Sequence, residues 1–290
     1  MKIGFLMRYE PERIAFARTH GCKSAGLIIR PEDSCLWANP DWRARAAEVR
    51  EAYAAAGIEV SSVGGMYRNI LDPAQTAELE KLFRGTVELA SFLGVGVVGC
   101  FAGRVMNEPL ENSLPAFKKI WSVQAKFASN HGVRIAFENC PQGPFHQPEG
   151  GTNFMSTPEM WERAFHELPL ENLGLQWDPS HLVCQLIDPI DSLKKFGKKI
   201  FHVHAKDAHI DHDIVAQHGL FHTGAATHRF PGLGDSNWTA IVSELKAQGY
   251  DGSLDIEGRH DPVYHGDRED EGLLIGIRCL REAVAAARCH

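Results

Sequence analysis

The sequence lacks the features that mark several large classes of protein. It has seven cysteines in 290 residues but no C-x-x-C pair, so neither a disulfide framework nor a zinc ribbon is expected. No apolar run approaches the roughly 20 residues that cross a bilayer. The apolar run near the N-terminus is too short for the core of a signal peptide. We therefore expect a cytoplasmic protein with no membrane partner.

Positive charge is also scarce. The chain has 30 Lys and Arg against 37 Asp and Glu, a formal net charge of −7. Proteins that bind nucleic acid usually carry a basic patch or a high isoelectric point, so nucleic acid is not an expected partner. No G-x-G-x-x-G turn follows the first apolar run, and no P-loop occurs. These absences disfavour the nucleotide-binding folds.

Strand-like and helix-like segments alternate along the whole sequence. The expected strands are residues 2–7, 24–30, 59–65, 96–101, 134–139, 173–178, 200–207 and 252–258. The expected helices are about residues 10–19, 40–56, 73–93, 110–130, 157–168, 189–197, 236–248 and 268–287. This alternation indicates an α/β fold with a parallel sheet covered by helices. Eight units favour a (β/α)8 TIM barrel over an open doubly wound sheet, and we expect residues 1–290 to form one domain.

Ionisable side chains lie at the ends of the last four expected strands. Glu138, Asp178 and Glu257 each follow an apolar run, and His204 lies near the end of the seventh strand. One such carboxylate alone is usually a cap or an ion-pair partner, but three buried together would need a cation. Three oxygen ligands and one nitrogen ligand suit Mn²⁺, Mg²⁺ or Co²⁺ better than a thiolate site would. We therefore predict one divalent metal, Mn²⁺ first, with Zn²⁺ as a further alternative.

The segment after Asp178 also has an ordinary interpretation. Asp178-Pro179-Ser180 is typical of a turn, because proline fixes φ and an Asp side chain can bond the backbone two residues on. The same turn would bring His181 back over the metal. Two long loops, residues 140–156 and 208–235, should leave this rim, where barrel enzymes place their chemistry.

Several segments together carry a family resemblance. They are "FEN", "WDPSH", "HVHAKDA", "RFPGLGDSNW", "GYDGSLDIEGRHDP" and "EGLLIGIRCL". With these segments the chain resembles the xylose-isomerase-like superfamily of TIM barrels, which includes tagatose/psicose epimerases, hydroxypyruvate isomerase, inosose dehydratase and endonuclease IV. The resemblance implies the same four metal ligands. It also implies that Glu138 and Glu257 act as the acid/base pair, and that His181 and Arg229 contact substrate oxygens.

Two further side chains have open roles. The loop "FHTGAATHRFPG" is similar to an epimerase signature, H-x-G-E-x-N-R-x-x-P-G, which makes His222 an alternative ligand or a substrate contact. His204 is preferred as the ligand because its strand context is stronger. Lys206 lies two residues after His204 and faces the same way. It could bind a substrate carboxylate or phosphate, or pair with an Asp or Glu.

The expected activity follows from this chemistry. Moving a proton between carbons next to a carbonyl requires stabilising an enediolate, which a chelated metal and two carboxylates can do. We expect a divalent-metal-dependent isomerase or epimerase that acts on a small carbohydrate as a homo-oligomer. The alternatives are a lyase that eliminates a β-hydroxyl or the aglycone of a 3-keto-glycoside, and a non-catalytic sugar-binding barrel or subunit of a hetero-oligomer. The third and fourth strands end without histidine, which disfavours DNA repair.

Overall fold

The computed structural model describes residues 1–143, 151–258 and 260–287. Within these residues the main sheet is a closed barrel with the strand order β1-β10-β7-β6-β5-β4-β3-β2, and neighbouring strands run parallel. The strands are β1 (Lys2–Met7), β2 (Ser24–Ile28), β3 (Glu59–Met66), β4 (Val97–Cys100), β5 (Arg134–Glu138), β6 (Leu173–Trp177), β7 (Ile200–Ala205) and β10 (Ser253–Ile256). The predicted (β/α)8 barrel is confirmed.

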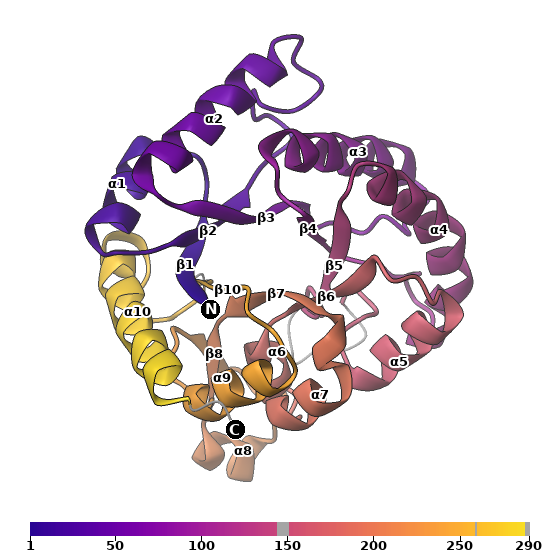
Figure 1. Cartoon of the computed structure of the whole chain (residues 1–290). Coiled ribbons are helices and arrows are strands. Elements are labelled where there is room, and N and C mark those ends of the chain that lie inside the picture. Colours follow the sequence, from indigo (N-terminus) through magenta and orange to yellow (C-terminus); the bar gives the residue numbers. More distant parts are fainter. Residues whose placement is uncertain (144–150, 259, 288–290) are drawn as a thin grey trace.

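Helices surround the barrel on its outside (Figure 1). They are α1 (Pro11–Thr19), α2 (Trp42–Ala56), α3 (Thr76–Leu93), α4 (Leu114–Asn130), α5 (Pro158–Glu167), α7 (Pro189–Phe196), α9 (Trp238–Ala247) and α10 (Glu269–Ala286). A short helix, α6 (Pro179–Val183), directly follows β6. Gly57 ends α2 with φ of 67°, a left-handed conformation in which glycine is favoured. The chain then turns directly into β3.

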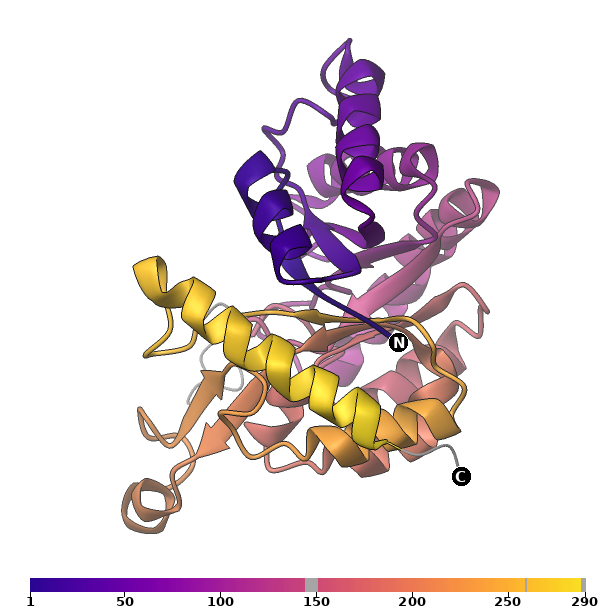
Figure 2. The same ribbon diagram turned by 60° about the vertical axis from the view of Figure 1, so that its left-hand side comes forward.

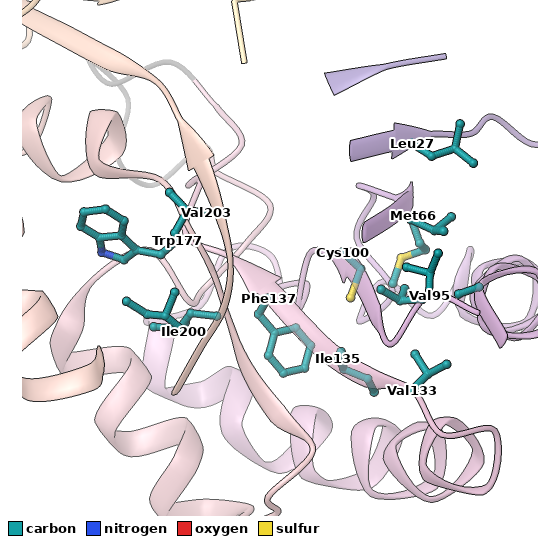
Figure 3. Packing of buried hydrophobic residues seen from close by; sticks show 14 of the residues in the cluster. Leu27, Met66, Val95, Cys100, Val133, Ile135, Phe137, Trp177, Ile200 and Val203 are labelled. Carbon is teal, nitrogen blue, oxygen red and sulfur yellow. The ribbon is translucent and has the colours of Figure 1, made fainter. Parts of the chain in front are cut away.

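The apolar core lies between the barrel and its helices (Figure 3). On β5, Ile135 and Phe137 are fully buried, and the ring of Phe137 meets Trp121 of α4 edge-on at 4.7 Å. On β6, Trp177 donates a hydrogen bond from Nε1 to Ser192 Oγ of α7, over 3.1 Å. Burying an apolar side chain of this size contributes about 1.5–3 kcal/mol. The outward-facing residues of the strands thus hold the helices, which leaves the barrel interior to the alternate residues.

The interior of the barrel contains a polar layer. Gln176 on β6, His202 on β7 and Asp255 on β10 are buried. His202 Nε2 lies 3.3 Å from Ser62 Oγ of β3, on the opposite side of the barrel. Glycines leave room for two of these side chains, because a Cβ at Gly4 on β1 would lie 2.6 Å from Asp255 Oδ1 and one at Gly99 on β4 would overlap with Gln176 Nε2. Polar residues and glycines here stand where TIM barrels usually place branched apolar residues.

The prediction of the seventh strand, residues 200–207, is wrong at the C-terminal end. β7 stops at Ala205, and the chain then enters β8 (Asp207–Ile210), which pairs antiparallel with β9 (Ala226–Arg229). α8 (His212–His218) lies between these two strands. The expected loop 208–235 therefore contains a hairpin, which projects from the barrel in Figure 2.

Asp207 holds the chain in this course. Its buried carboxylate accepts hydrogen bonds from the backbone N–H groups of Gly232 and Ser236, over 3.2 and 3.0 Å. It also accepts one from Trp238 Nε1, over 3.1 Å. These donors follow Asp207 by 25 to 31 residues, so the local pattern, which looks like one continuous strand, could not reveal them.

Three further expectations concern membrane-spanning helices, disulfides and the loop 140–156. None of their helices has both the length and the apolar character needed to cross a bilayer. No disulfide framework was expected from the sequence. The six described cysteines are free thiols. Part of the expected loop 140–156, residues 144–150, lies outside the described residues.

Candidate metal centre

Four side chains meet at the carboxyl-terminal rim of the barrel. They are Glu138 at the end of β5, Asp178 after β6, His204 on β7 and Glu257 after β10. One possible ligand atom of each lies within 4.8 Å of those of the others. The first three side chains are at most 7% exposed and that of Glu257 is 12% exposed. Across the described residues, this is the one such group of three or more potential ligands.

His204 lies between two of the carboxylates. Its Nδ1 is 3.4 Å from Glu138 Oε1 and 3.2 Å from Glu257 Oε2. Burial by itself lowers the pKa of His204, but the two carboxylates outweigh burial and raise that pKa to about 10. Positive charge is therefore favoured between these carboxylates.

Lys206 adds a second positive charge to the group. Its side chain is 2% exposed, and its Nζ lies 3.2 Å from Glu257 Oε1 and 3.9 Å from Asp178 Oδ2. Burial lowers the pKa of Lys206, but Glu257 and Asp178 outweigh burial and hold that pKa above its ordinary value. Of the two roles expected for Lys206, the structure shows the ion pair. When His204 is neutral, as a metal ligand must be, three carboxylates and one ammonium leave two negative charges, which is the charge that a divalent cation balances.

The donor atoms of this group fit a divalent cation. Asp178 Oδ2 is buried and has no hydrogen-bond partner among the described residues, and His204 Nδ1 lies between Glu138 and Glu257. Leaving buried polar atoms unsatisfied costs about 1–3 kcal/mol each. Burial raises the pKa of Asp178 to about 7, against the opposing effect of Lys206. A hard or borderline divalent metal would accept the lone pairs of this O,O,O,N set and relieve these costs.

The segment that follows Asp178 is a helix start, where the sequence predicted a turn. Asp178 is the N-cap of α6, and its Oδ1 accepts a hydrogen bond from Ser180 N over 2.8 Å. Pro179 occupies the first helical position, where its missing N–H costs nothing. His181 then lies in the first turn, with Nε2 3.3 Å from Asp178 Oδ2 and 3.8 Å from Glu138 Oε1.

Two asparagines fix the strand ends that carry the carboxylates. The side-chain amide of Asn139 bonds both backbone groups of Asp178, accepting from its N–H over 2.7 Å and donating to its carbonyl over 2.8 Å. Asn153 Nδ2 donates to the carbonyl of Glu138 over 2.8 Å. These roles were not predicted from the sequence, although Asn139 belongs to the "FEN" segment.

Two histidines lie beside the centre, and one of them, His228, was missed as a site residue. The rings of His228 and His181 lie 4.9 Å apart, and those of His228 and His260 lie 5.9 Å apart. His260 Nδ1 is 3.5 Å from Lys206 Nζ. Both histidines lie in segments that local patterns assigned to loops, so only the folded chain brings them here.

The remaining expected contacts lie on the hairpin. Arg229, at the end of β9, donates from Nε to Asp261 Oδ2 over 3.0 Å, which ties the hairpin to the segment after β10. His222 is exposed, stacks on His218 at 4.5 Å between ring centroids, and is not a member of the four-residue group.

The centre opens into a cavity of about 230 Å³. Beside Glu138, His204 and Glu257, its wall includes Tyr67 and Phe101. A wall of aromatic and ionisable side chains is typical of a site for a small polar molecule with an apolar face.

A family comparison agrees with this geometry. The family model described as "Xylose isomerase-like TIM barrel" matches residues 14–283. The chain belongs to this family. The inosose dehydratase of Clostridium tetani (strain Massachusetts / E88) is 30% identical over 165 residues, which cover 54% of this chain and 54% of that protein. The match thus spans about half of that family member.

Solved structures share the fold over their whole length. A crystal structure of IOLI protein with a binding zinc atom has a TM-score of 0.76 at 20% identity, covering 100% of both chains. The D-psicose 3-epimerase of Clostridium cellulolyticum H10, solved with D-tagatose, has a TM-score of 0.72 at 15% identity, covering 98% of this chain and 99% of that chain. At these identities the likeness shows the TIM-barrel fold of the family.

Proposed function

We propose that the protein is a divalent-metal-dependent isomerase or epimerase of a small sugar or keto-sugar. The observation that carries the proposal is the buried group in which Glu138 and Glu257 flank His204 on the rim of the barrel. Family membership and the D-psicose 3-epimerase neighbour support carbohydrate chemistry. We also propose a cytoplasmic homo-oligomer, for which light scattering of the purified protein would measure the mass.

We propose that Glu138, Asp178, His204 and Glu257 hold the metal. When bound, a divalent cation would polarise the substrate carbonyl and favour negative charge on the adjacent oxygen. Mn²⁺ remains our first choice for the three oxygen ligands, and the zinc atom in the IOLI structure supports Zn²⁺ as the second. Removing the metal with a chelator should abolish turnover, and adding back single metals should identify the one that restores it.

The chain's own residues would move the proton. One of Glu138 and Glu257 takes the proton from the carbon next to the carbonyl, and the other returns a proton to a neighbouring carbon or to the opposite face. Burial disfavours the charged form of Glu257, but Lys206 and His204 outweigh burial and hold the pKa of Glu257 well below its ordinary value. Glu257 is therefore ionised at neutral pH and able to accept a proton.

Two other residues would contact the substrate, and a third would act through Glu257. We propose that His181, 3.3 Å from Asp178 Oδ2, bonds a hydroxyl of the sugar. Arg229 would contact a more distant oxygen from its place beside Asp261. Lys206 would act on the substrate indirectly, through the charge it places on Glu257. His222 has no part in this proposal, because it is exposed on the hairpin.

A lyase is the second candidate, and the inosose dehydratase relative favours it. One of the two glutamates would remove the proton next to the carbonyl, and the β-hydroxyl would leave as water with a proton donated by the other. The test is to incubate the Mn²⁺-loaded protein in D₂O with D-psicose, D-tagatose, a 3-keto-glycoside and an inosose.

Each outcome of this test separates the alternatives. Epimer formation with deuterium on carbon supports the isomerase or epimerase. Loss of water or of the aglycone supports the lyase. Binding of a sugar without any exchange would support the non-catalytic barrel or a subunit that needs a partner, and would contradict both enzymatic proposals.

A further inference from the structure

A chain of hydrogen bonds runs through the barrel beneath the metal centre. Its members Gln176, His202 and Asp255 lie on β6, β7 and β10, each two positions before a proposed ligand in the chain, so they face the interior one layer lower. All three are at most 1% exposed. The fourth member, Tyr67, follows β3 and lines the cavity of the metal centre.

The bonds of this chain all point in one direction. The hydroxyl of Tyr67 donates to Gln176 Oε1 over 2.8 Å, which leaves the amide nitrogen of Gln176 3.1 Å from His202 Nδ1. An amide nitrogen can only donate, so Nδ1 accepts and the ring proton is on Nε2. His202 Nε2 then donates to Asp255 Oδ2 over 2.8 Å. Every donor therefore points away from the cavity and toward the carboxylate.

The carboxylate of Asp255 fixes this direction. It also accepts hydrogen bonds from Ser24 Oγ, over 2.7 Å to Oδ1, and from Ser61 Oγ to Oδ2. Because Ser24 Oγ, Ser61 Oγ and His202 Nε2 all donate to this carboxylate, the direction of the chain is set from this end. Hydrogen bonds in series also polarise one another inside a protein.

The backbone leaves room for the chain at two glycines. A Cβ atom at Gly64 would overlap with the phenol of Tyr67, and one at Gly99 would overlap with the amide of Gln176. The ring of Tyr67 is also held edge-on against Phe101, at 5.1 Å between centroids. Tyr67 thus has a defined position at the cavity wall.

We propose that Tyr67 accepts a hydrogen bond from a substrate hydroxyl and so selects sugars that carry a hydroxyl at that position. The proposal rests on the proposed function, because it concerns the same cavity. The hydrogen of Tyr67 is committed to Gln176, so its oxygen can only accept from a ligand. A keto oxygen, a carboxylate or an ether at that position would meet the lone pairs of Tyr67 and be disfavoured. Gln176 and His202 act as positioning residues.

The first test combines enzyme and substrate changes. Binding of D-tagatose and of its single deoxy analogues to the Mn²⁺-loaded protein is measured by calorimetry for the wild type and for Tyr67→Phe. We expect that removing one particular substrate hydroxyl weakens binding about fivefold to tenfold in the wild type, and less than twofold in Tyr67→Phe. Tyr250→Phe is the control, since the Tyr250 hydroxyl donates to Ser253 O, two residues before Asp255 and away from the cavity lining.

A second variant tests the direction of the chain. Gln176→Leu removes the acceptor for the Tyr67 proton, so the phenol can turn and donate. The variant should prefer a hydroxyl over a keto group, at the substrate position next to Tyr67, less strongly than the wild type does. Tyr67 itself is unchanged in this variant. A purely structural effect would instead weaken the binding of all analogues by the same factor, and that result would contradict the proposal.

A third measurement needs no substrate. Nitrogen-15 NMR should show His202 as a neutral ring with its proton on Nε2, and Gln176→Leu should shift the Nδ1 resonance. A proton on Nδ1 in the wild type would overturn the direction of the chain. If no sugar binds the wild type, the proposed function fails and this inference with it. If sugars bind but each lost hydroxyl costs the same in the wild type and Tyr67→Phe, the inference alone fails.

Discussion

Asp178 uses its two carboxylate oxygens for different tasks. Oδ1 accepts the Ser180 N–H and starts α6, whereas Oδ2 faces His181, Lys206 and the metal centre. The helix cap therefore orients the side chain and fixes which oxygen is offered to a cation. Replacing Asp178 would remove a cap and a proposed ligand together, so this substitution cannot separate folding from function.

Glu138 and Glu257 are better positions for that separation. Neither is a helix cap in the structure. We expect Glu138→Gln and Glu257→Gln each to lower turnover by about 10²-fold to 10⁴-fold, because an amide cannot act as the base. Circular dichroism should show the wild-type fold in both variants, and Glu159→Gln on the outer helix α5 is the control. Full activity in either variant would contradict the acid/base assignment.

Metal binding should release protons to an extent that depends on pH. The pKa of His204 is raised to about 10, so the ring is protonated at neutral pH in the metal-free protein and must lose that proton to become a ligand. Burial raises the pKa of Asp178 to about 7, which adds a second proton below that pH.

Calorimetry in buffers of different ionisation enthalpy measures this release. We expect about one proton for each metal near pH 8 and about two near pH 6. Affinity for the metal should therefore rise as the pH rises, and more steeply below pH 7. Binding at pH 6 without proton release would show that these two residues are not ligands.

At the scale of single elements, the strand ends are held by side chains from the neighbouring segment. Asn139 follows β5 and bonds both backbone groups of Asp178, which follows β6. The chain segments that carry the proposed ligands Glu138 and Asp178 are thus hydrogen-bonded to each other, independently of any metal. The rim is fixed by side-chain amides as well as by the sheet.

Asn139→Ala should therefore weaken both the fold and the metal centre. We expect the free energy of unfolding to fall by about 1–3 kcal/mol, because two buried backbone groups lose their partners. Metal affinity should fall as well. The matched control is Asn172→Ala, which removes a hydrogen bond to Ala125 O at the opposite end of β6. Equal loss of metal affinity in both variants would contradict a specific role for Asn139.

Local sequence patterns predicted the barrel strands well and the hairpin poorly. The strands were predictable because buried apolar runs alternate with helical segments. β7 was extended too far because the residues that draw Asp207 out of the barrel lie beyond position 230. The four-residue group was proposed because the carboxyl ends of parallel strands share one rim. His228 and Tyr67 had no such signal, since their positions depend on the course of loops.

At the scale of the whole molecule, the four proposed ligands come from the ends of four strands of one closed barrel. A cation that binds only the folded protein stabilises it by about 2.7 kcal/mol at a hundredfold excess over Kd. We expect thermal unfolding to shift upward by roughly 5–10 °C with Mn²⁺, and a chelator to reverse the shift. The double variant Glu138→Gln, Glu257→Gln is the control. A similar shift in that variant would place the stabilising metal elsewhere.

The space at Gly99 has an evolutionary consequence. Because a Cβ there would overlap with the side chain of Gln176, neither position can change freely while the other is kept. Relatives with a long side chain at the position of Gln176 should therefore retain glycine on the fourth strand. Relatives with a larger residue on the fourth strand should carry a short one on the sixth. An alignment of the family in which these two positions vary independently would contradict this expectation.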